Sequence, residues 1–415
     1  MNLGTGSFAL NTTAPFPDDL SIIFAGDFCP VGRTDGAIVA GQAAAMAAPL
    51  REVLAAKDLA IVNLEAPLTT LASPIAKTGP NLKGDPRAIE FLQATGFDVA
   101  NLANNHIRDH DDDAIRNTLS VLESGQVAPV GAGIDATRAA RPLFIERKGR
   151  RIGMLAFAEN EFSIAGPQHA GAAPLDPLVN IEQIRAVAAE ADVTIVLVHG
   201  GNEYCPVPNP RTVINYRAFA RAGASAVIAT HTHCPQGIEI VDGVPIAYSL
   251  GNFLFDTPFT DRPYRTDDQW WQGLVLQLDF NGRSAVRLKV TPVDSGPDGT
   301  VVRPLIDSAR TAALSYLDHL SALLGDDNAR QQLWQAWCFE QGPWWHDYFK
   351  SLGTPDEVLK CTDPTNLMAL RNGFTCEAHY EVLKTYFSML WEGVPAPSAD
   401  VIERLHNLQN GRINS

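Results

Sequence analysis

The sequence has 415 residues, of which 46% are hydrophobic and 19% are charged, and its formal net charge is −15. A chain of this length can bury one large core and a second, smaller body, because single cores stop growing at roughly 250–300 residues. The acidic balance excludes a general affinity for nucleic acid or for an anionic membrane surface, since both need a basic face.

The first twenty residues contain no basic segment followed by an apolar run, and no apolar stretch of about 18 residues occurs later. The six cysteines form no CxxC pair and no dense framework, which fits a reduced compartment. We therefore expect a cytoplasmic protein with no membrane partner and no nucleic-acid partner. The sequence leaves its oligomeric state open.

Short apolar runs rich in β-branched residues, each bounded by turn residues, predict the strands of a sheet. In chain order they are 21–25, 59–64, 98–102, 151–157, 193–198, 224–230 and 244–250. Helical patterns alternate with them, several ending at a glycine, over 37–57, 86–95, 114–124, 181–190 and 213–222. This alternation predicts a layered α/β fold.

The pattern changes after Asp294, where the turn-rich segment SGPDGT precedes helical sequence. Apolar residues recur at i, i+3 and i+4 over 306–324 and 378–391. Five of the seven tryptophans lie in this part: Trp334, Trp337, Trp344, Trp345 and Trp391. We favour core packing over cleft lining for them, because aromatic residues at helical spacing usually pack. We predict a catalytic domain over 18–294 and a helical, aromatic-rich region over 300–415 that packs on or over the active site.

Five of the predicted strands end at residues that bind metals in proteins. These residues are Asp27, Glu65, Asn105 with His106, His199, and the pair His231 and His233. In an open α/β sheet the carboxyl ends of the strands line one crevice, so side chains from distant positions would meet there. A single histidine on an apolar strand is more often a satisfied core residue than a ligand, and the prediction therefore depends on the whole set.

The ligand types indicate which metals fit. Carboxylates, an amide oxygen and imidazoles together suit two divalent cations such as Mn, Fe, Zn or Co, whereas an all-oxygen set would indicate Mg or Ca. His231 and His233 are two residues apart, so in an extended backbone their side chains would point the same way and reach neighbouring metals.

Six segments resemble the CapA-like proteins, a branch of the calcineurin-like metallophosphoesterase superfamily named for poly-γ-glutamate capsule synthesis. The segments are GDFCPVGR at 26–33, NLEAPLT at 63–69, NLANNH at 101–106, HGGNEY at 199–204, THTHCPQ at 230–236 and YSLGNFLFD at 248–256. The resemblance covers about residues 21–256 and leaves the C-terminal region unexplained. It implies a four-layer αββα metallophosphoesterase sandwich with a binuclear metal centre at the strand ends.

The resemblance also implies roles for individual residues. Asp27 is similar to the carboxylate of the first metal, Glu65 takes the place of the bridging carboxylate, and Asn105 would bind the second metal. His199, His231 and His233 would complete the two metal shells. His106 resembles the histidine beside the bound substrate, which makes it the predicted catalytic residue, and Asp109 is close enough in sequence to orient it.

Two positions depart from the wider superfamily. Other members carry a histidine two residues after the first aspartate, but this sequence has Cys29, which is either a thiolate ligand or a small buried hydrophobe. Glu65 stands where phosphatases have a bridging aspartate, in agreement with the CapA-like branch.

Three classes of function stay open from the sequence. The first is a two-metal hydrolase in which a metal-bridged hydroxide attacks a phosphoester or a γ-glutamyl or peptide-like amide of an anionic, carboxylate-bearing intracellular substrate, either a small molecule or a peptide. The second is a metal-assisted isomerase (epimerase) or ligase acting on a peptidic substrate. The third is a non-catalytic, polymer-handling protein of capsule synthesis. The complete ligand set favours the hydrolase.

Four further residues are predicted near the substrate. Arg33 would fork onto a substrate carboxylate or phosphate, or else form a structural salt bridge. Glu203 and Tyr204 follow His199 closely and are expected at the rim of the crevice. Asn252 follows the strand 244–250, and we expect it either to contact substrate or to fix a loop, the second being favoured.

Overall fold

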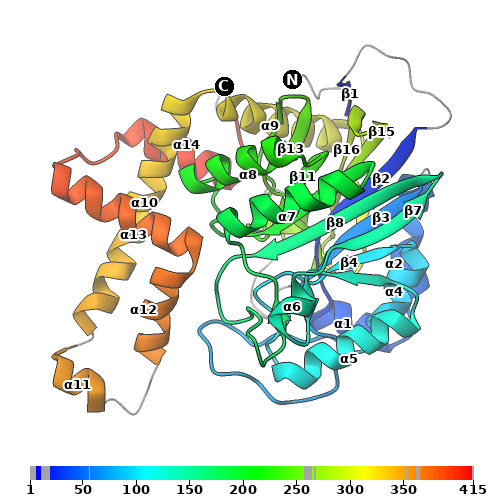
Figure 1. The fold of residues 1–415 in the computed structure, drawn as a ribbon. Helices are drawn as coiled ribbons and strands as arrows, with labels where there is room; N and C mark the ends of the chain where they lie inside the picture. Colours follow the sequence, from blue (N-terminus) through cyan, green and yellow to red (C-terminus); the bar gives the residue numbers. More distant parts are fainter. Residues whose placement is uncertain are drawn as a thin grey trace.

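Two β-sheets pack face to face at the centre of the molecule in the computed structural model (Figure 1). The structure describes residues 6–10, 19–55, 57–256, 264–265, 268–351, 353–360 and 365–413. Residue 18, the predicted start of the catalytic domain, lies outside these residues. Within them, no helix combines the length and the apolar character that a membrane crossing needs.

The larger sheet contains the first three strands predicted from the sequence, which are parallel to one another. Its order is β1 (Ser7–Ala9), β16 (Ser284–Asp294), β15 (Gln272–Asn281), β2 (Leu20–Cys29), β3 (Leu59–Leu64), β4 (Val99–Asn101) and β5 (Ala128–Val130), with β14 (Asn252–Phe255) paired to β2 and β17 (Arg303–Pro304) to β16. The long antiparallel hairpin of β15 and β16 was not predicted.

The smaller sheet contains the other four predicted strands. Its order is β12 (Ile238–Val241), β13 (Val244–Ala247), β11 (Ala226–Thr230), β10 (Val193–His199), β8 (Arg150–Ala158) and β7 (Leu143–Arg147). The strands β8, β10, β11 and β13 are parallel. A short pair, β6 (Ala132–Gly133) and β9 (Gly171–Ala172), lies apart from both sheets.

Alternate residues of β10 show how the layers are built. Ile195 and Leu197 belong to the core between the sheets, whereas Val196 and Val198 pack in a second core with Phe219 of α8 (Pro210–Ala222). Successive side chains of a strand point to opposite faces, so β10 is covered on both sides. α7 (Pro177–Glu190) lies beside α8 on this outer face (Figure 1).

Helices on the opposite side of the molecule cover the larger sheet (Figure 1). They are α1 (Gly32–Val39), α2 (Ala43–Ala47), α3 (Arg51–Ala55), α4 (Ala88–Thr95) and α5 (Asp111–Ser124); α6 (Ala136–Ala139) is a short connector. The predicted αββα order is thereby confirmed. The single helix predicted over 37–57 is wrong, because Gly41 adopts φ +79° after α1 and Pro49 starts a separate turn.

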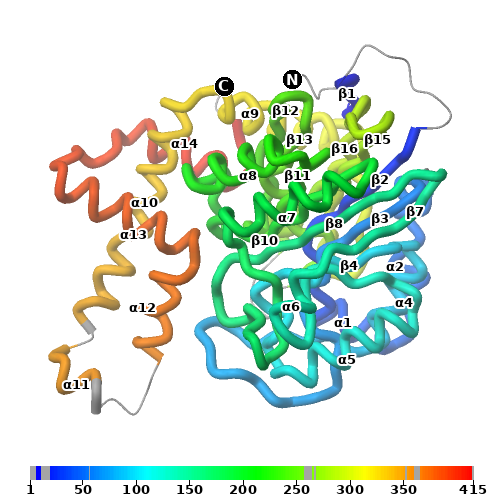
Figure 2. The backbone as a smooth tube through the Cα atoms, viewed as in Figure 1, coloured from blue at the N-terminus to red at the C-terminus, as the bar shows by residue number. Residues whose placement is uncertain are grey.

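The C-terminal region is helical, as predicted, and stands beside the sandwich (Figure 2). Its helices are α9 (Asp307–Leu324), α10 (Asp327–Ser351), α11 (Pro355–Lys360), α12 (Thr365–Thr375), α13 (Glu377–Glu392) and α14 (Ala399–Gln409). Trp334, Trp337 and Trp345 are buried in a core shared with Cys205 and Val207 of the sandwich. Trp344 and Trp391 are exposed. The division at 294–300 stays a prediction, since α9 packs on β12 and belongs to both bodies.

Candidate metal centre

The carboxyl ends of β2, β3, β10 and β11 bring the predicted ligands to one place between the two sheets. Asp27 lies near the end of β2, Glu65 directly follows β3, His199 ends β10, and His231 directly follows β11. The parallel registers align these ends, because Asp27 pairs with Asn63 in β3 and His199 pairs with Thr230 in β11. Asn105 and His106 lie in the turn after β4.

Asp27 is fully buried and is held by neighbours on both sides. Its Oδ1 accepts a hydrogen bond from Asn63 Nδ2 at 2.7 Å, and its Oδ2 accepts one from the backbone N–H of His231 at 3.1 Å. Burial raises the pKa of Asp27 to about 6, although these hydrogen bonds oppose the rise. A nearby cation would stabilise the ionised form.

Glu65 has the least satisfied side chain in the centre. Both of its carboxylate oxygens are buried, and neither has a hydrogen-bond partner among the described residues. Its Oε1 lies 3.5 Å from His199 Nε2 and 3.8 Å from His233 Nε2. Burial, followed by the negative charge of Asp27, raises the pKa of Glu65 well above its usual value. A buried carboxylate without donors is the arrangement that a metal ion resolves, so the donor set fits divalent cations.

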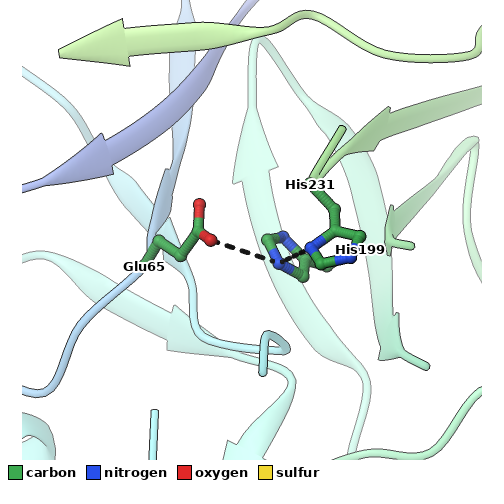
Figure 3. Close-up of side chains that lie close together, drawn as sticks. All are labelled: Glu65, His199 and His231. Carbon is green, nitrogen blue, oxygen red and sulfur yellow. Dashed lines mark hydrogen bonds and ion pairs between the residues drawn. The ribbon is translucent and has the colours of Figure 1, made fainter. Parts of the chain in front are cut away.

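His199 lies between Glu65 and His231 (Figure 3). Its Nε2 is 3.0 Å from both Asn105 Oδ1 and His231 Nδ1, and its Nδ1 is 3.1 Å from Thr230 Oγ1. Burial, followed by the adjacent His231, lowers the pKa of His199 well below its usual value. Neutral imidazole is the form that binds metals.

The backbone conformation that brings His231 and His233 to the centre was not predicted from the sequence. The expectation of an extended backbone is wrong, because β11 ends at Thr230 and the two histidines adopt φ values of +99° and +54°. Such values cost of order 1–3 kcal/mol in residues other than glycine, and they cluster at functional sites. Asn252 Oδ1 lies 2.9 Å from His233 Nδ1 and fixes that ring.

Among the described residues, two groups of side chains place ligand atoms within 4.8 Å of one another: Glu65 with His199 and His231, and Asp27 with Glu65 and His233. Glu65 is common to both groups. Asn105 lies against the first group through His199. Five of the six predicted ligands thus lie in these groups, and their roles as ligands remain proposals.

His106 lies beside the ligands in a buried network that includes a residue missed from the sequence. Asp109 Oδ2 is 2.6 Å from His106 Nδ1, and a carboxylate can only accept, so this contact places a proton on Nδ1. Lys77 Nζ donates to Asp109 Oδ1 at 2.6 Å, and the Lys77 side chain is only 4% exposed. Burial and then the charge of Lys77 lower the pKa of His106, which leaves Nε2 as an acceptor.

The sequence offered one signal for Lys77. It lies in the segment 69–87 between β3 and α4, which forms almost no regular structure. Long irregular segments in compact domains are often functional. Asn63, which orients Asp27, was also missed, because an asparagine inside an apolar run gave no separate signal.

Cys29 belongs to neither ligand group. It is fully buried in an apolar cluster with Phe255, Trp270 and Trp271, and burial raises the pKa of its thiol well above the usual value. We expect Cys29→Ala to retain the metal content of the parent, because the thiol packs as a small hydrophobe. Elemental mass spectrometry of the purified variant checks this, and a loss of one metal ion per chain would instead identify Cys29 as a ligand.

The predicted substrate residues have different surroundings. Arg33 forks onto Asp256, with Nη2 2.6 Å from Oδ1, which is the structural salt bridge offered as its alternative role. Asn252 is buried between His233 and the carbonyl of Trp270, in the fixing role favoured for it. Glu203 and Tyr204 line a cleft of about 450 Å³ that His231 also lines.

The sequence matches a known protein family. A family model described as "Bacterial capsule synthesis protein PGA_cap" matches residues 21–257, more than half of the chain. The chain belongs to this family. The predicted CapA-like resemblance is thus confirmed.

Individual relatives give the extent of the similarity. "PGA biosynthesis protein CapA" of Bacillus subtilis (strain 168) is 30% identical over 58% of this chain and 63% of that protein. "Capsule biosynthesis protein CapA" of Bacillus anthracis is 28% identical over 52% of each. The match therefore spans less than two thirds of either relative. Among solved structures, a 5′-nucleotidase precursor from Thermus thermophilus overlaps with a TM-score of 0.42 and 13% identity, over 74% of this chain and 60% of that one.

Proposed function

We propose that this PGA_cap family member is a metal-dependent hydrolase that cleaves a phosphoester or a γ-glutamyl or peptide-like amide. The single observation that carries the proposal is Glu65, whose two buried oxygens lack donors and which belongs to both ligand groups. Two divalent cations such as Mn, Fe, Zn or Co, when bound, polarise the reacting oxygen and lower the pKa of water towards neutrality. The family's capsule name and the names of its relatives are compatible with an amide substrate.

The chain's own groups would complete the reaction. Asp27, Glu65, Asn105, His199, His231 and His233 would hold the cations. Asp109 holds the ring of His106 with its proton on Nδ1. The other ring nitrogen, Nε2, would therefore transfer the proton at the leaving group. Burial alone would raise the pKa of Asp109, but the contact with His106 and then the charge of Lys77 outweigh this effect, so the pKa of Asp109 is lowered.

Two variants separate metal binding from proton transfer. We expect His106→Gln to keep the metal content of the parent and to lose about 10²–10⁴-fold in kcat, since a positioned general acid or base contributes that much. We expect the double variant His231→Ala/His233→Ala to lose most of its metal. The measurements are elemental mass spectrometry and a turnover screen over phosphoesters and γ-glutamyl amides. Unchanged turnover in His106→Gln would remove His106 from the mechanism.

A second candidate function is proton transfer at a carbon next to a metal-polarised carbonyl, which would make the protein an epimerase. It is supported by the same His106–Asp109 pair, because an oriented imidazole serves either reaction. Incubating a peptide with the protein in D₂O separates the two. Deuterium at an α-carbon without cleavage supports the epimerase, and cleavage without deuterium supports the hydrolase.

A further inference from the structure

A cleft beside the metal centre lies between the sandwich and the C-terminal helices. Its volume is about 450 Å³, and the sandwich contributes Glu161, Glu203, Tyr204 and His231 to its walls, while α10 contributes Trp344 among others. His231 is a candidate metal ligand, so the cleft adjoins the proposed metal centre.

The charged side chains of this cleft are acidic. Glu161 and Glu203 line it, and no lysine or arginine does so among the residues that the structure describes. The remaining titratable imidazoles belong to His231 and His379, and burial lowers the pKa of both. The neighbouring cavity, which shares Glu161, differs because Arg108 and Arg371 line it. The acidic character is thus specific to the cleft that contains His231.

Glu161 and Glu203 lie close enough to influence each other. Glu203 reaches solvent through the cleft, yet enclosure by the cleft walls, followed by the negative charge of Glu161, raises the pKa of Glu203 to about 7. Neither carboxylate belongs to a group of described residues that could hold a bare metal ion. A larger, molecular cation between them would relieve their repulsion.

Tryptophans of α10 form the opposite wall. Trp344 is 53% exposed although it is large and apolar, and its ring packs edge-on against Trp345 at 4.7 Å between centroids. Trp337, also in the wall, is 5% exposed, and its buried Nε1–H has no acceptor among the described residues. Indole faces attract cations, so the exposed ring of Trp344 suits a cationic ligand.

We propose that this cleft binds a primary ammonium group of an amino-acid or peptide substrate. Glu161 and Glu203 neutralise the ammonium, and the exposed ring of Trp344 covers its alkyl stem. The assignment rests on the proposed function in that the same substrate reacts at the metal centre. It alters the sequence-based expectation of an anionic substrate: the reacting group is anionic or polarisable, and the recognised group is cationic.

Binding of two small probes to the protein as purified tests this proposal. Benzylammonium and benzyl alcohol have similar shapes and differ in charge. We expect benzylammonium to bind roughly tenfold more tightly than benzyl alcohol. Isothermal titration calorimetry gives the affinities, and quenching of tryptophan fluorescence reports on the wall formed by α10. The preference should weaken as salt is added.

Charge-removing variants locate the effect. The double variant Glu161→Gln/Glu203→Gln should bind benzylammonium and benzyl alcohol alike, whereas Asp347→Asn, an exposed control on α10 outside the cleft, should keep the preference. Glu161 accepts a bond from Asn372, so Glu203→Gln alone carries the test if the double variant does not fold. Equal binding of benzylammonium and benzyl alcohol by the parent would overturn the proposal. No turnover is involved, so this result is independent of whether the protein is a hydrolase.

Discussion

Glu65→Gln is expected to remove most of the stability that the protein gains from metal. In the metal-free protein the substitution removes a buried carboxyl group that has no donors and lies beside Asp27, so it should stabilise the fold by about 1–3 kcal/mol. In the metal-loaded protein it removes the ligand common to both groups. A metal at 100 times its Kd stabilises a folded protein by about 2.7 kcal/mol, and the variant should lose most of that gain.

The measurement is the Tm of parent and variant, with and without added Mn²⁺ or Zn²⁺, beside metal content. Glu159→Gln provides a matched control, because Glu159 is also buried with a raised pKa but accepts hydrogen bonds from Gly201 and Cys376 and belongs to neither ligand group. We expect Glu159→Gln to respond to metal as the parent does. If Glu65→Gln and the parent gained equal stability from metal, the binuclear centre would have to be abandoned.

The candidate site was predictable because the carboxyl ends of parallel strands lie at the same edge of a sheet. Asp27, Glu65 and His199 each end an apolar run in the sequence, and the registers of β2 with β3 and of β10 with β11 place those ends together. The alternation of strands and helices likewise predicted the layers. Both inferences use periodicities that a single sequence carries.

Features set by long-range contacts were not predictable. Lys77 gained its role only when its loop folded against Asp109, more than 30 residues away. The positive φ values of His231 and His233 are imposed by the turn that leaves β11, and histidine itself does not favour them. From the sequence, a substrate contact and a structural salt bridge were equally plausible for Arg33. The fold places Asp256, which is distant in sequence, within hydrogen-bond distance of its guanidinium. The hairpin of β15 and β16 was missed for a different reason, since apolar residues alternate in both strands and the signal was present in the sequence.

Gly26→Ala is expected to destabilise the protein by about 3 kcal/mol or more, the largest single effect that we predict for a methyl group. A Cβ at position 26 would lie 1.9 Å from the carbonyl oxygen of Gly251, which is backbone and cannot rotate away. That same oxygen accepts the backbone N–H of Asp27 at 3.0 Å. Separating β2 from the start of β14 would therefore displace Asp27 from Asn252, its partner in the strand register.

Urea denaturation of metal-free protein measures this effect without involving the ligands, and Gly36→Ala is its control. Gly36 lies in α1, where an added Cβ would meet nothing within 4 Å, so alanine should stabilise the protein by about 0.5–1 kcal/mol. Opposite signs from the same chemical change would show that the close approach at Gly26, and not a general intolerance of alanine, fixes the edge on which Asp27 lies. A midpoint for Gly26→Ala equal to that of the parent would contradict the close approach and, with it, the positioning of Asp27 described above.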